Sequence, residues 1–335
     1  MLSEVQQKQL EKQQYRLVGN HSAVKVCGWT KSMLRNKGGC YKFKFYGIRS
    51  HQCMQMTSSM YCANRCSFCW RGEKAPVSKE WYGDIDNPID IISGSKEAHL
   101  SLLEGFHGNK EVNTKLLDQM KDVKHVALSL TGEPITYPKF NELVEEFHKR
   151  GISTFLVTNA QFPEALENLK TVTQLYVSVD APNKLILKDV DKPLFPDYYE
   201  RLQKSLDILA KKKCRTCIRL TVIRNLNDTD LDGYKALIEK GNPDFIEVKG
   251  YMFVGESTKH LVRENMPEHE YVVEFANKLL EVLPDYEIIS EHVPSRVLCF
   301  IKKSFNKKQY IDFHKYFEDP ELDAIEYSSE KMCLN

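Results

Sequence analysis

Short apolar segments recur along the middle of the chain, separated by polar stretches. Six of them are rich in β-branched and apolar residues, and they span residues 54–60, 125–130, 153–159, 174–180, 217–223 and 244–250. Near-continuous hydrophobicity over so few residues is typical of strands that are buried on both faces, as in a parallel sheet. The pattern therefore predicts six parallel strands.

Amphipathic segments lie between these strands. In residues 137–151, the apolar positions Phe140, Leu143, Val144 and Phe147 recur at helical spacing. Further segments of this kind span residues 198–213 and 231–241. Strand–helix alternation predicts a parallel sheet with right-handed crossovers. No G-x-G-x-x-G follows any of these strands, so the pattern favours an α/β fold with an incomplete (β/α)6 TIM-like barrel over a dinucleotide-binding fold.

Two segments flank this predicted core. Residues 54–283 make up the partial barrel, and residues 1–53 form a basic N-terminal extension with little strand periodicity. Residues 284–335 contain strand candidates at 286–290 and 297–301, followed by a charged, helix-prone tail. We expect both extensions to pack on the barrel, because no flexible linker separates them from it.

The composition is that of a globular protein in the cytoplasm. Of 335 residues, 42% are hydrophobic and 28% are charged. No apolar run approaches the roughly 20 residues needed to cross a bilayer, and the polar N-terminus does not resemble a signal peptide. We therefore expect a cytoplasmic protein with no membrane association. We also expect a monomer.

Charge is distributed unevenly along the chain. Residues 1–80 carry 14 Lys or Arg against 4 Asp or Glu, whereas the remainder carries 33 against 42. Such segregation is typical of a surface that binds a polyanion such as nucleic acid. A solvated basic surface is the alternative.

Three cysteines crowd into one short segment. Cys62, Cys66 and Cys69 follow the first predicted strand with the spacing C-x3-C-x2-C, and the loop contains no fourth cysteine or histidine. Cytoplasmic thiols stay reduced, so clustered cysteines are metal ligands more often than disulfides. Structural zinc sites usually take four ligands, whereas three cysteines can hold a four-iron cluster with one open iron. A zinc or simple redox site is the alternative.

This spacing, with an aromatic residue before the third cysteine, resembles the signature of the radical S-adenosylmethionine (SAM) superfamily. The segment "SLTGEP" at 129–134 resembles the glycine-rich segment with which that superfamily binds SAM, although Thr131 replaces its first glycine. The resemblance implies a 4Fe–4S cluster on Cys62, Cys66 and Cys69, whose open iron binds SAM. One-electron reduction of SAM would then release a 5′-deoxyadenosyl radical.

The resemblance also implies SAM-binding residues at the ends of the strands. The candidates are Gly132, Glu133, Pro134, Asn159, Ser178 and Asp180. Active sites of barrels gather at the C-terminal ends of their strands. For Asn159, Ser178 and Asp180, ordinary turn and helix-cap roles are the alternative.

A second set of cysteines precedes the first. Cys27, Cys40 and Cys53 are separated by twelve residues each time, within the basic extension. Three inert buried cysteines would explain them, but their position favours a second 4Fe–4S cluster with an open iron. Cys214 and Cys217 lie three residues apart in a predicted strand, where their side chains face opposite ways, so we interpret this pair as structural.

The double cysteine arrangement resembles the archaeal-type tRNA 4-demethylwyosine synthase family. The similarity extends over nearly the whole chain, through residues 35–57, 62–72, 129–134, 156–164, 176–182 and 246–257. It implies a lyase-type reaction that joins N1-methylguanosine-37, in the anticodon loop of tRNA(Phe), to pyruvate and forms the tricyclic 4-demethylwyosine. The radical takes hydrogen from the N1-methyl group, and the second cluster holds pyruvate. The electron comes from an external one-electron reductant.

The region around Cys40 contains candidates for the pyruvate site. Lys42 could form a Schiff base with pyruvate, contact phosphate or remain solvated, and Lys44 competes for the same role. Glu247 and Lys249, on the last predicted strand, could line the cavity or form a buried ion pair.

Basic and aromatic residues near the cysteines are candidates for RNA contacts, because proteins grip unstacked bases with such groups. They are Lys31, Arg35, Lys37, Lys44, Arg49, Trp70 and Arg71, with the basic stretch 302–308 near the C-terminus. Two other functions remain open. One is another two-cluster radical SAM enzyme acting on tRNA, such as a methylthiotransferase, and the other is a non-catalytic iron–sulfur or zinc protein that binds RNA.

Overall fold

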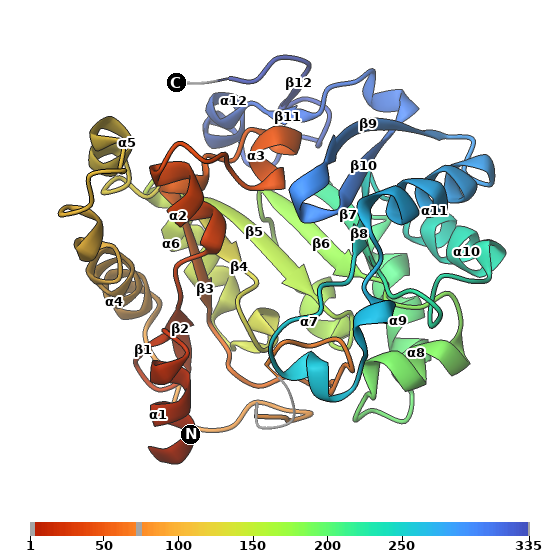
Figure 1. The fold of residues 1–335 in the computed structure, drawn as a ribbon, viewed down its shortest axis with the longest axis horizontal. Helices are drawn as coiled ribbons and strands as arrows, with labels where there is room; N and C mark the ends of the chain where they lie inside the picture. Colours follow the sequence, from red (N-terminus) through yellow and green to blue (C-terminus); the bar gives the residue numbers. More distant parts are fainter. Residues whose placement is uncertain (1–3, 72–75, 334–335) are drawn as a thin grey trace.

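The computed structural model describes residues 4–71 and 76–333, and one large sheet dominates it (Figure 1). Six parallel strands form its centre in sequence order: β3 (Cys53–Thr57), β4 (His125–Leu128), β5 (Ser153–Thr158), β6 (Gln174–Ser178), β7 (Arg215–Val222) and β8 (Phe245–Gly250). All six predicted strands are confirmed, and their parallel pairing is too. The order follows from crossovers that each place the next strand beside the last.

Antiparallel strands extend the sheet at both edges. β1 (Arg16–Val18) and β2 (Ser22–Val24) join β3 at one edge, and β10 (Val297–Lys302) and β9 (Tyr286–His292) join β8 at the other. Within the described residues, the order begins at β1 and ends at β9 without pairing these two strands, so the barrel is incomplete, as predicted. The N-terminal strands are three residues each, too short for their periodicity to show in the sequence.

Helices cover the outer face of the sheet (Figure 1). They are α4 (Pro88–Ser101), α6 (Phe140–Lys149), α7 (Pro163–Glu167), α8 (Lys184–Asp191), α9 (Tyr198–Leu209), α10 (Leu231–Gly241) and α11 (His269–Glu281). The three helices predicted at 137–151, 198–213 and 231–241 are confirmed. In α6, all four residues of the predicted apolar stripe are buried. In the described part of the chain, no helix is both long enough and apolar enough to cross a membrane.

Smaller elements complete the chain. They are α1 (Glu4–Lys12), α2 (Gly28–Leu34), α3 (Tyr41–Tyr46), α5 (Thr114–Gln119), α12 (Phe313–Glu318) and a small ribbon of β11 (Tyr310–Ile311) and β12 (Ser328–Ser329). Helix α3 contacts β9 and β11, far from it in sequence. The N-terminal segment thus packs against the C-terminal one.

Helix α3 lies against the inner face of the sheet. Its residues Tyr41 and Tyr46 donate hydrogen bonds to the Glu247 carboxylate over 3.1 and 2.9 Å. The same helix packs its aromatic rings against inner residues of the strands, including Tyr176 and Phe245. A buried carboxylate costs much free energy unless hydrogen bonds satisfy it, so these two bonds fix α3 in place.

The inner face of the sheet is not completely buried. Several inward-facing residues are partly exposed. Six of them line a space that we call the lumen: Gln55, Ala127, Val157, Ser178, Arg219 and Lys249. Their outward-facing neighbours, such as Met56, Leu128 and Leu220, are fully buried under the helices. Water therefore reaches the inside of the barrel, where polar side chains stand on four of these six positions.

The C-terminal segment is anchored at the N-terminal ends of the strands. Arg215 is fully buried, and its guanidinium donates hydrogen bonds to the Gln309 carbonyl, the Ser328 hydroxyl and the Gln174 side chain. It also stacks over Phe245, 4.3 Å from the ring centroid. These contacts join β6, β7 and the C-terminal ribbon into one unit.

We predict that Arg215→Met lowers the free energy of unfolding by about 3 kcal/mol, because it leaves buried acceptors without a donor. Chemical denaturation followed by circular dichroism measures this change. Arg150→Met is the matched control, since Arg150 makes a partly exposed ion pair with Glu146 at the end of α6, and its loss should cost less than about 1 kcal/mol. Equal losses in the two variants would contradict the anchoring role.

Candidate active site

The loop that follows β3 carries Cys62, Cys66 and Cys69, and main-chain contacts hold it from three sides. Residues 76–78 pair with Cys62, through its amide and its carbonyl. Residues 190–194, at the end of α8 and directly after it, accept or donate four main-chain hydrogen bonds along residues 63–67. The amide of Glu256 donates to the carbonyl of Trp70 at 2.9 Å. Main-chain contacts from three segments of the fold therefore position the loop.

The thiols of this triplet lie close enough to influence one another. Burial raises the pKa of Cys62 to about 12, and Cys69 adds to this shift. Burial also raises the pKa of Cys66, assisted by the nearby Asp191 carboxylate. Two N–H groups point at the sulfur of Cys62: the Asn159 side chain at 3.2 Å and the Asn64 amide at 3.4 Å. Such donors stabilise a sulfur ligand that carries negative charge.

The segment after β4 folds directly onto this loop. Glu133 donates its amide to the Tyr61 carbonyl at 2.8 Å and accepts the Asn159 amide at 3.0 Å. Burial raises the pKa of Glu133 to about 7, although hydrogen bonds from residues 158 and 159 act to lower this pKa. Its second carboxylate oxygen is buried without a partner among the described residues. That oxygen can accept a hydrogen bond from a bound ligand.

Asn159 is held toward Cys62 by its local backbone. It directly follows β5, and its side-chain oxygen accepts the Gln161 amide at 3.1 Å. The next residue, Ala160, has φ +63° and is buried, a conformation that costs about 1 kcal/mol or more for a residue with a side chain. Backbone strain of this kind often accompanies functional sites.

Ser178 and Asp180 lie at the end of β6, on the lumen side. Ser178 is half-buried, whereas Asp180 is 5% exposed. Burial raises the pKa of Asp180 to about 6, and the Arg219 guanidinium opposes this shift. One oxygen of Asp180 has no hydrogen-bond partner within the described residues. Asp180 lies close enough to the cysteine loop for its charge to raise the pKa of Cys66.

The second triplet also converges. Cys27 precedes α2, Cys40 precedes α3, and Cys53 begins β3 on its inner face. Burial raises the pKa of Cys40 and of Cys53 to about 12 each, and both are raised further by Cys27. The Ser50 hydroxyl accepts the Cys40 amide at 2.8 Å and so fixes the start of α3.

Lys42 and Lys44 differ in position. The ammonium group of Lys42 lies 3.8 Å from the ring centroid of Tyr176, inside the barrel, and lowers the pKa of both Cys40 and Cys53. Lys44 is exposed. Of the two candidates, Lys42 is therefore the one that faces the second triplet.

The thiols of each triplet are neighbours, since they raise the pKa values of one another. All six of these cysteines are half-buried. Across residues 4–71 and 76–333, no three His, Cys, Asp or Glu side chains are arranged as ligands of one metal ion.

Comparisons with known proteins agree with this geometry. Residues 56–238 match the family described as "Radical SAM superfamily", and residues 240–302 match "Wyosine base formation". A solved structure described as "Structure of TYW1 with a lysine-pyruvate adduct bound" is 34% identical, has a TM-score of 0.82, and aligns over 93% of this chain and 99% of its own. The chain belongs to the tRNA 4-demethylwyosine synthase family.

Other members of the family share the same core. An archaeal TYW1 crystal structure is 33% identical with a TM-score of 0.75, and 98% of it is covered. The mouse SAM-dependent tRNA 4-demethylwyosine synthase TYW1 is 48% identical over 91% of this chain but only 42% of its own length. The rice synthase is 46% identical over 95% of this chain and 50% of its own. The chain thus spans about half the length of these curated relatives.

The predicted RNA-binding residues fall into two groups. Lys31, Arg35, Lys37, Lys44 and Arg49 lie on or beside α2 and α3 and are at least partly exposed. Trp70 and Arg71 are half-buried and make contacts within the protein, and their RNA-binding role stays a prediction. Trp70 stacks on Tyr15 with centroids 6.0 Å apart, and Arg71 donates to the Met60 carbonyl at 3.3 Å.

The basic stretch 302–308 lies far from the cysteine loop. It follows β10, and the amide of Lys302 bonds to the Asp244 carbonyl, just before β8 begins. This is the N-terminal end of the parallel strands, whereas the cysteine loop is at their C-terminal end (Figure 1). Cys214 and Cys217 belong to different core clusters, so this pair is structural, as predicted.

Sequence reasoning missed two contributors to the site. Asp191 accepts a hydrogen bond from the Asn64 side chain at 3.2 Å and so supports the cysteine loop. Arg219 stands in the lumen between Ser178 and Glu247, its register partners on β6 and β8. The arginine within the apolar segment "CIRLTVI" could have identified Arg219 from the sequence.

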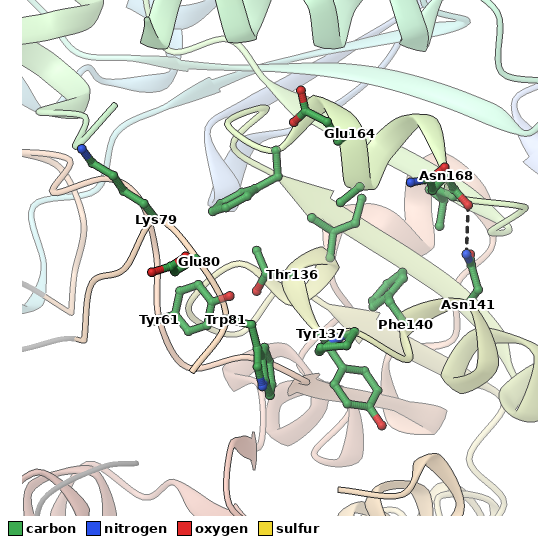
Figure 2. Close-up of a pocket in the computed structure, with 15 residues that line it drawn as sticks. Tyr61, Lys79, Glu80, Trp81, Thr136, Tyr137, Phe140, Asn141, Glu164 and Asn168 are labelled. Carbon is green, nitrogen blue, oxygen red and sulfur yellow. Dashed lines mark hydrogen bonds between the residues drawn. The ribbon is translucent and has the colours of Figure 1, made fainter. Parts of the chain in front are cut away.

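A separate pocket of about 360 Å³ opens beside the cysteine loop (Figure 2). Figure 2 shows aromatic rings of Tyr61, Trp81 and Tyr137 along it, and a hydrogen bond of 2.9 Å from Asn141 to the Asn168 carbonyl at its far end. Tyr61 directly precedes Cys62. The pocket is therefore at the rim of the site, with aromatic faces and amide groups on its walls.

We predict that Gly132→Ala disrupts the site through a backbone collision. A Cβ atom at Gly132 would lie 2.0 Å from the Ser59 carbonyl oxygen, next to the cysteine loop. The variant should lose more than about tenfold in SAM affinity, since a misplacement of about 1 Å can cost a hundredfold in a preorganised site. Equilibrium dialysis with labelled SAM measures the affinity.

Gly151→Ala is the matched control. Gly151 has φ +65°, close to the +67° of Gly132, but a Cβ there meets no atom within 4 Å. Both variants bear the same backbone strain, and only one bears the collision. Similar SAM affinities in the two would show that the close approach of residues 59 and 132 is unimportant.

Proposed function

We propose that the protein condenses N1-methylguanosine-37 of tRNA(Phe) with pyruvate to form 4-demethylwyosine. The observation that carries this proposal is the convergence of two cysteine triplets on one barrel, in a member of the tRNA 4-demethylwyosine synthase family. The substrates are those that the family's name and the resemblance of the sequence imply. Two separate triplets would allow SAM and pyruvate to bind at different sites.

Cys62, Cys66 and Cys69 would hold the 4Fe–4S cluster that membership of the radical SAM superfamily implies. Bound there, the cluster supplies the electron that cleaves SAM to a 5′-deoxyadenosyl radical, and a separate reductant replenishes it. The chain's own contribution is to orient SAM. The unpartnered oxygen of Glu133 is suited to its amino group, and Asn159 supports both Glu133 and Cys62.

Cys27, Cys40 and Cys53 would hold a second cluster, next to Lys42. Their thiols share the environment of buried sulfur ligands that the first triplet has. The Lys42 amine can condense with the keto group of pyruvate and release water, which fixes the pyruvate methyl and carboxyl groups inside the barrel. A relative whose structure is described with a lysine–pyruvate adduct supports this assignment.

The RNA would approach from the C-terminal ends of the strands. The modified base must leave its stack to place its N1-methyl group in the lumen, at a cost of roughly a few kcal/mol. Basic residues on α2 and α3 supply phosphate contacts that offset part of this cost. The aromatic walls of the pocket beside Tyr61 are of the kind that hold unstacked bases.

We predict that anaerobically reconstituted protein with SAM, pyruvate, a chemical reductant and N1-methylated tRNA(Phe) yields 4-demethylwyosine. Mass spectrometry of the digested tRNA detects the product, and chromatography detects 5′-deoxyadenosine. Formation of neither compound, with tRNA binding intact, would favour a non-catalytic RNA-binding protein. Transfer of a methylthio group would favour the other radical SAM function.

Cysteine variants separate the two sites. Cys62→Ala should abolish both 5′-deoxyadenosine and product. Replacing Cys27, Cys40 and Cys53 together by Ala should remove about half of the iron and all product, but leave slow SAM cleavage. Cys333→Ala, far along the chain, is the control. Full iron and product in the triple variant would contradict the second cluster.

We predict that Lys42→Arg abolishes covalent trapping of pyruvate. Borohydride reduction of a Schiff base leaves a stable mass increase on one peptide, which peptide mass spectrometry locates. Arginine keeps the positive charge but does not form the Schiff base at neutral pH, because its guanidinium stays protonated. Lys44→Arg, two residues away and exposed, should trap pyruvate as the unaltered protein does. Trapping of pyruvate on Lys44 instead would assign the Schiff-base role to Lys44 and not to Lys42.

A further inference from the structure

Two lysines and one arginine bring positive charge to the inner face of the barrel. They are Lys42 on α3, Arg219 on β7 and Lys249 on β8. Lys42 has a role in the proposed function. Lys249 donates to the Ser295 carbonyl at 2.9 Å, so the sequence-based alternative of a Glu247–Lys249 ion pair is not what the structure contains. Arg219 remains without an assigned role.

The register of the sheet fixes where Arg219 points. It pairs with Ser178 on one side and with Glu247 on the other. Glu247 faces inward, because its carboxylate accepts both tyrosine hydroxyls of α3. Partners in one row of a parallel sheet share a face, so Arg219 points into the lumen as well.

The guanidinium group of Arg219 has hydrogen-bond donors that no described residue uses. Among residues 4–71 and 76–333, its guanidinium makes no hydrogen bond and no ion pair. The nearby carboxylates act on it only through space, since Glu247 is bound by Tyr41 and Tyr46, and Asp180 bonds to Thr221. The residue is half-buried, so a ligand in the lumen can reach it. A planar guanidinium with free N–H groups matches a carboxylate, which it can bind through two parallel hydrogen bonds.

Arg219 also lies near the place assigned to the 2-oxo acid. One step along the inner face of β7 is Cys217, and its partner on β6 is Tyr176, the residue beneath the Lys42 ammonium group. Inner positions on one strand are about 7 Å apart, which an arginine side chain spans. An acid bound at Lys42 thus places its carboxylate within range of this guanidinium.

We propose that Arg219 is the residue that binds the carboxylate of the 2-oxo acid in the lumen. The proposal rests on the proposed function, because it requires an acid held at Lys42. A carboxylate has two oxygens with several lone pairs, so it can accept from Arg219 and still have an oxygen free for iron. The arginine thereby selects 2-oxo acids over neutral carbonyl compounds.

The test measures pyruvate binding without turnover. Protein lacking SAM and RNA is titrated with pyruvate, and borohydride trapping on Lys42 is quantified by mass spectrometry. Arg219→Gln should raise the half-saturating pyruvate concentration by about tenfold or more, the effect of losing charge-assisted hydrogen bonds. Arg219→Lys should recover part of the loss. Affinities for SAM and tRNA, measured separately, should change less than twofold.

Arg224→Gln is the matched control, since its guanidinium lies over Tyr271, 4.9 Å from the ring centroid and beyond the end of β7. Iron content and thermal unfolding confirm that each variant is folded. Unchanged pyruvate saturation in Arg219→Gln would overturn the proposal, and so would a loss confined to SAM or tRNA affinity. Failure of the unaltered protein to trap pyruvate would overturn the proposed function, and this proposal with it.

Discussion

One buried carboxylate joins the N-terminal segment to the barrel. Glu247 is fully buried and accepts hydrogen bonds from Tyr41 and Tyr46, both on a helix six residues long. A helix this short has little stability of its own, so its position depends on tertiary contacts. Because Cys40 and Lys42 flank Tyr41 in sequence, the bonds to Glu247 also determine where a thiol and an amine stand. The second cysteine site depends on this interaction.

The two cysteine sites are held by different kinds of contact. The loop of Cys62 is fixed by main-chain hydrogen bonds from three segments, and the close packing at Gly132 keeps it against the strand that follows. The site of Cys40 is fixed by side chains that reach across the sheet. Main-chain contacts tolerate many sequences, whereas a buried polar network requires particular partners. The position of Cys40 therefore depends on the identity of individual side chains more than the position of Cys62 does.

The sequence predicts the strands well because parallel strands are apolar on both faces, and a long apolar segment has few other uses. It predicts the cysteine loop because its spacing is local. The strands β1 and β2 were not predicted, since three residues carry no periodicity. Segment 190–194 was also missed, because its contacts with residues 63–67 are made through the main chain and so leave no trace in residue types. Trp70 was assigned to RNA from its chemistry, and only its stacking on Tyr15 shows a packing role.

Polar residues inside an apolar sheet are the link between fold and chemistry here. Burying the charges of Arg219 and Lys249 without partners in a closed core would cost roughly several kcal/mol for each ion. An incomplete barrel avoids much of that cost, because its inner face stays accessible to water along one side while its outer face is sealed by helices. The gap between β1 and β9 is thus a condition for keeping charge next to the cysteines. A closed eight-stranded barrel would fill the same space with side chains and leave no room for reactants.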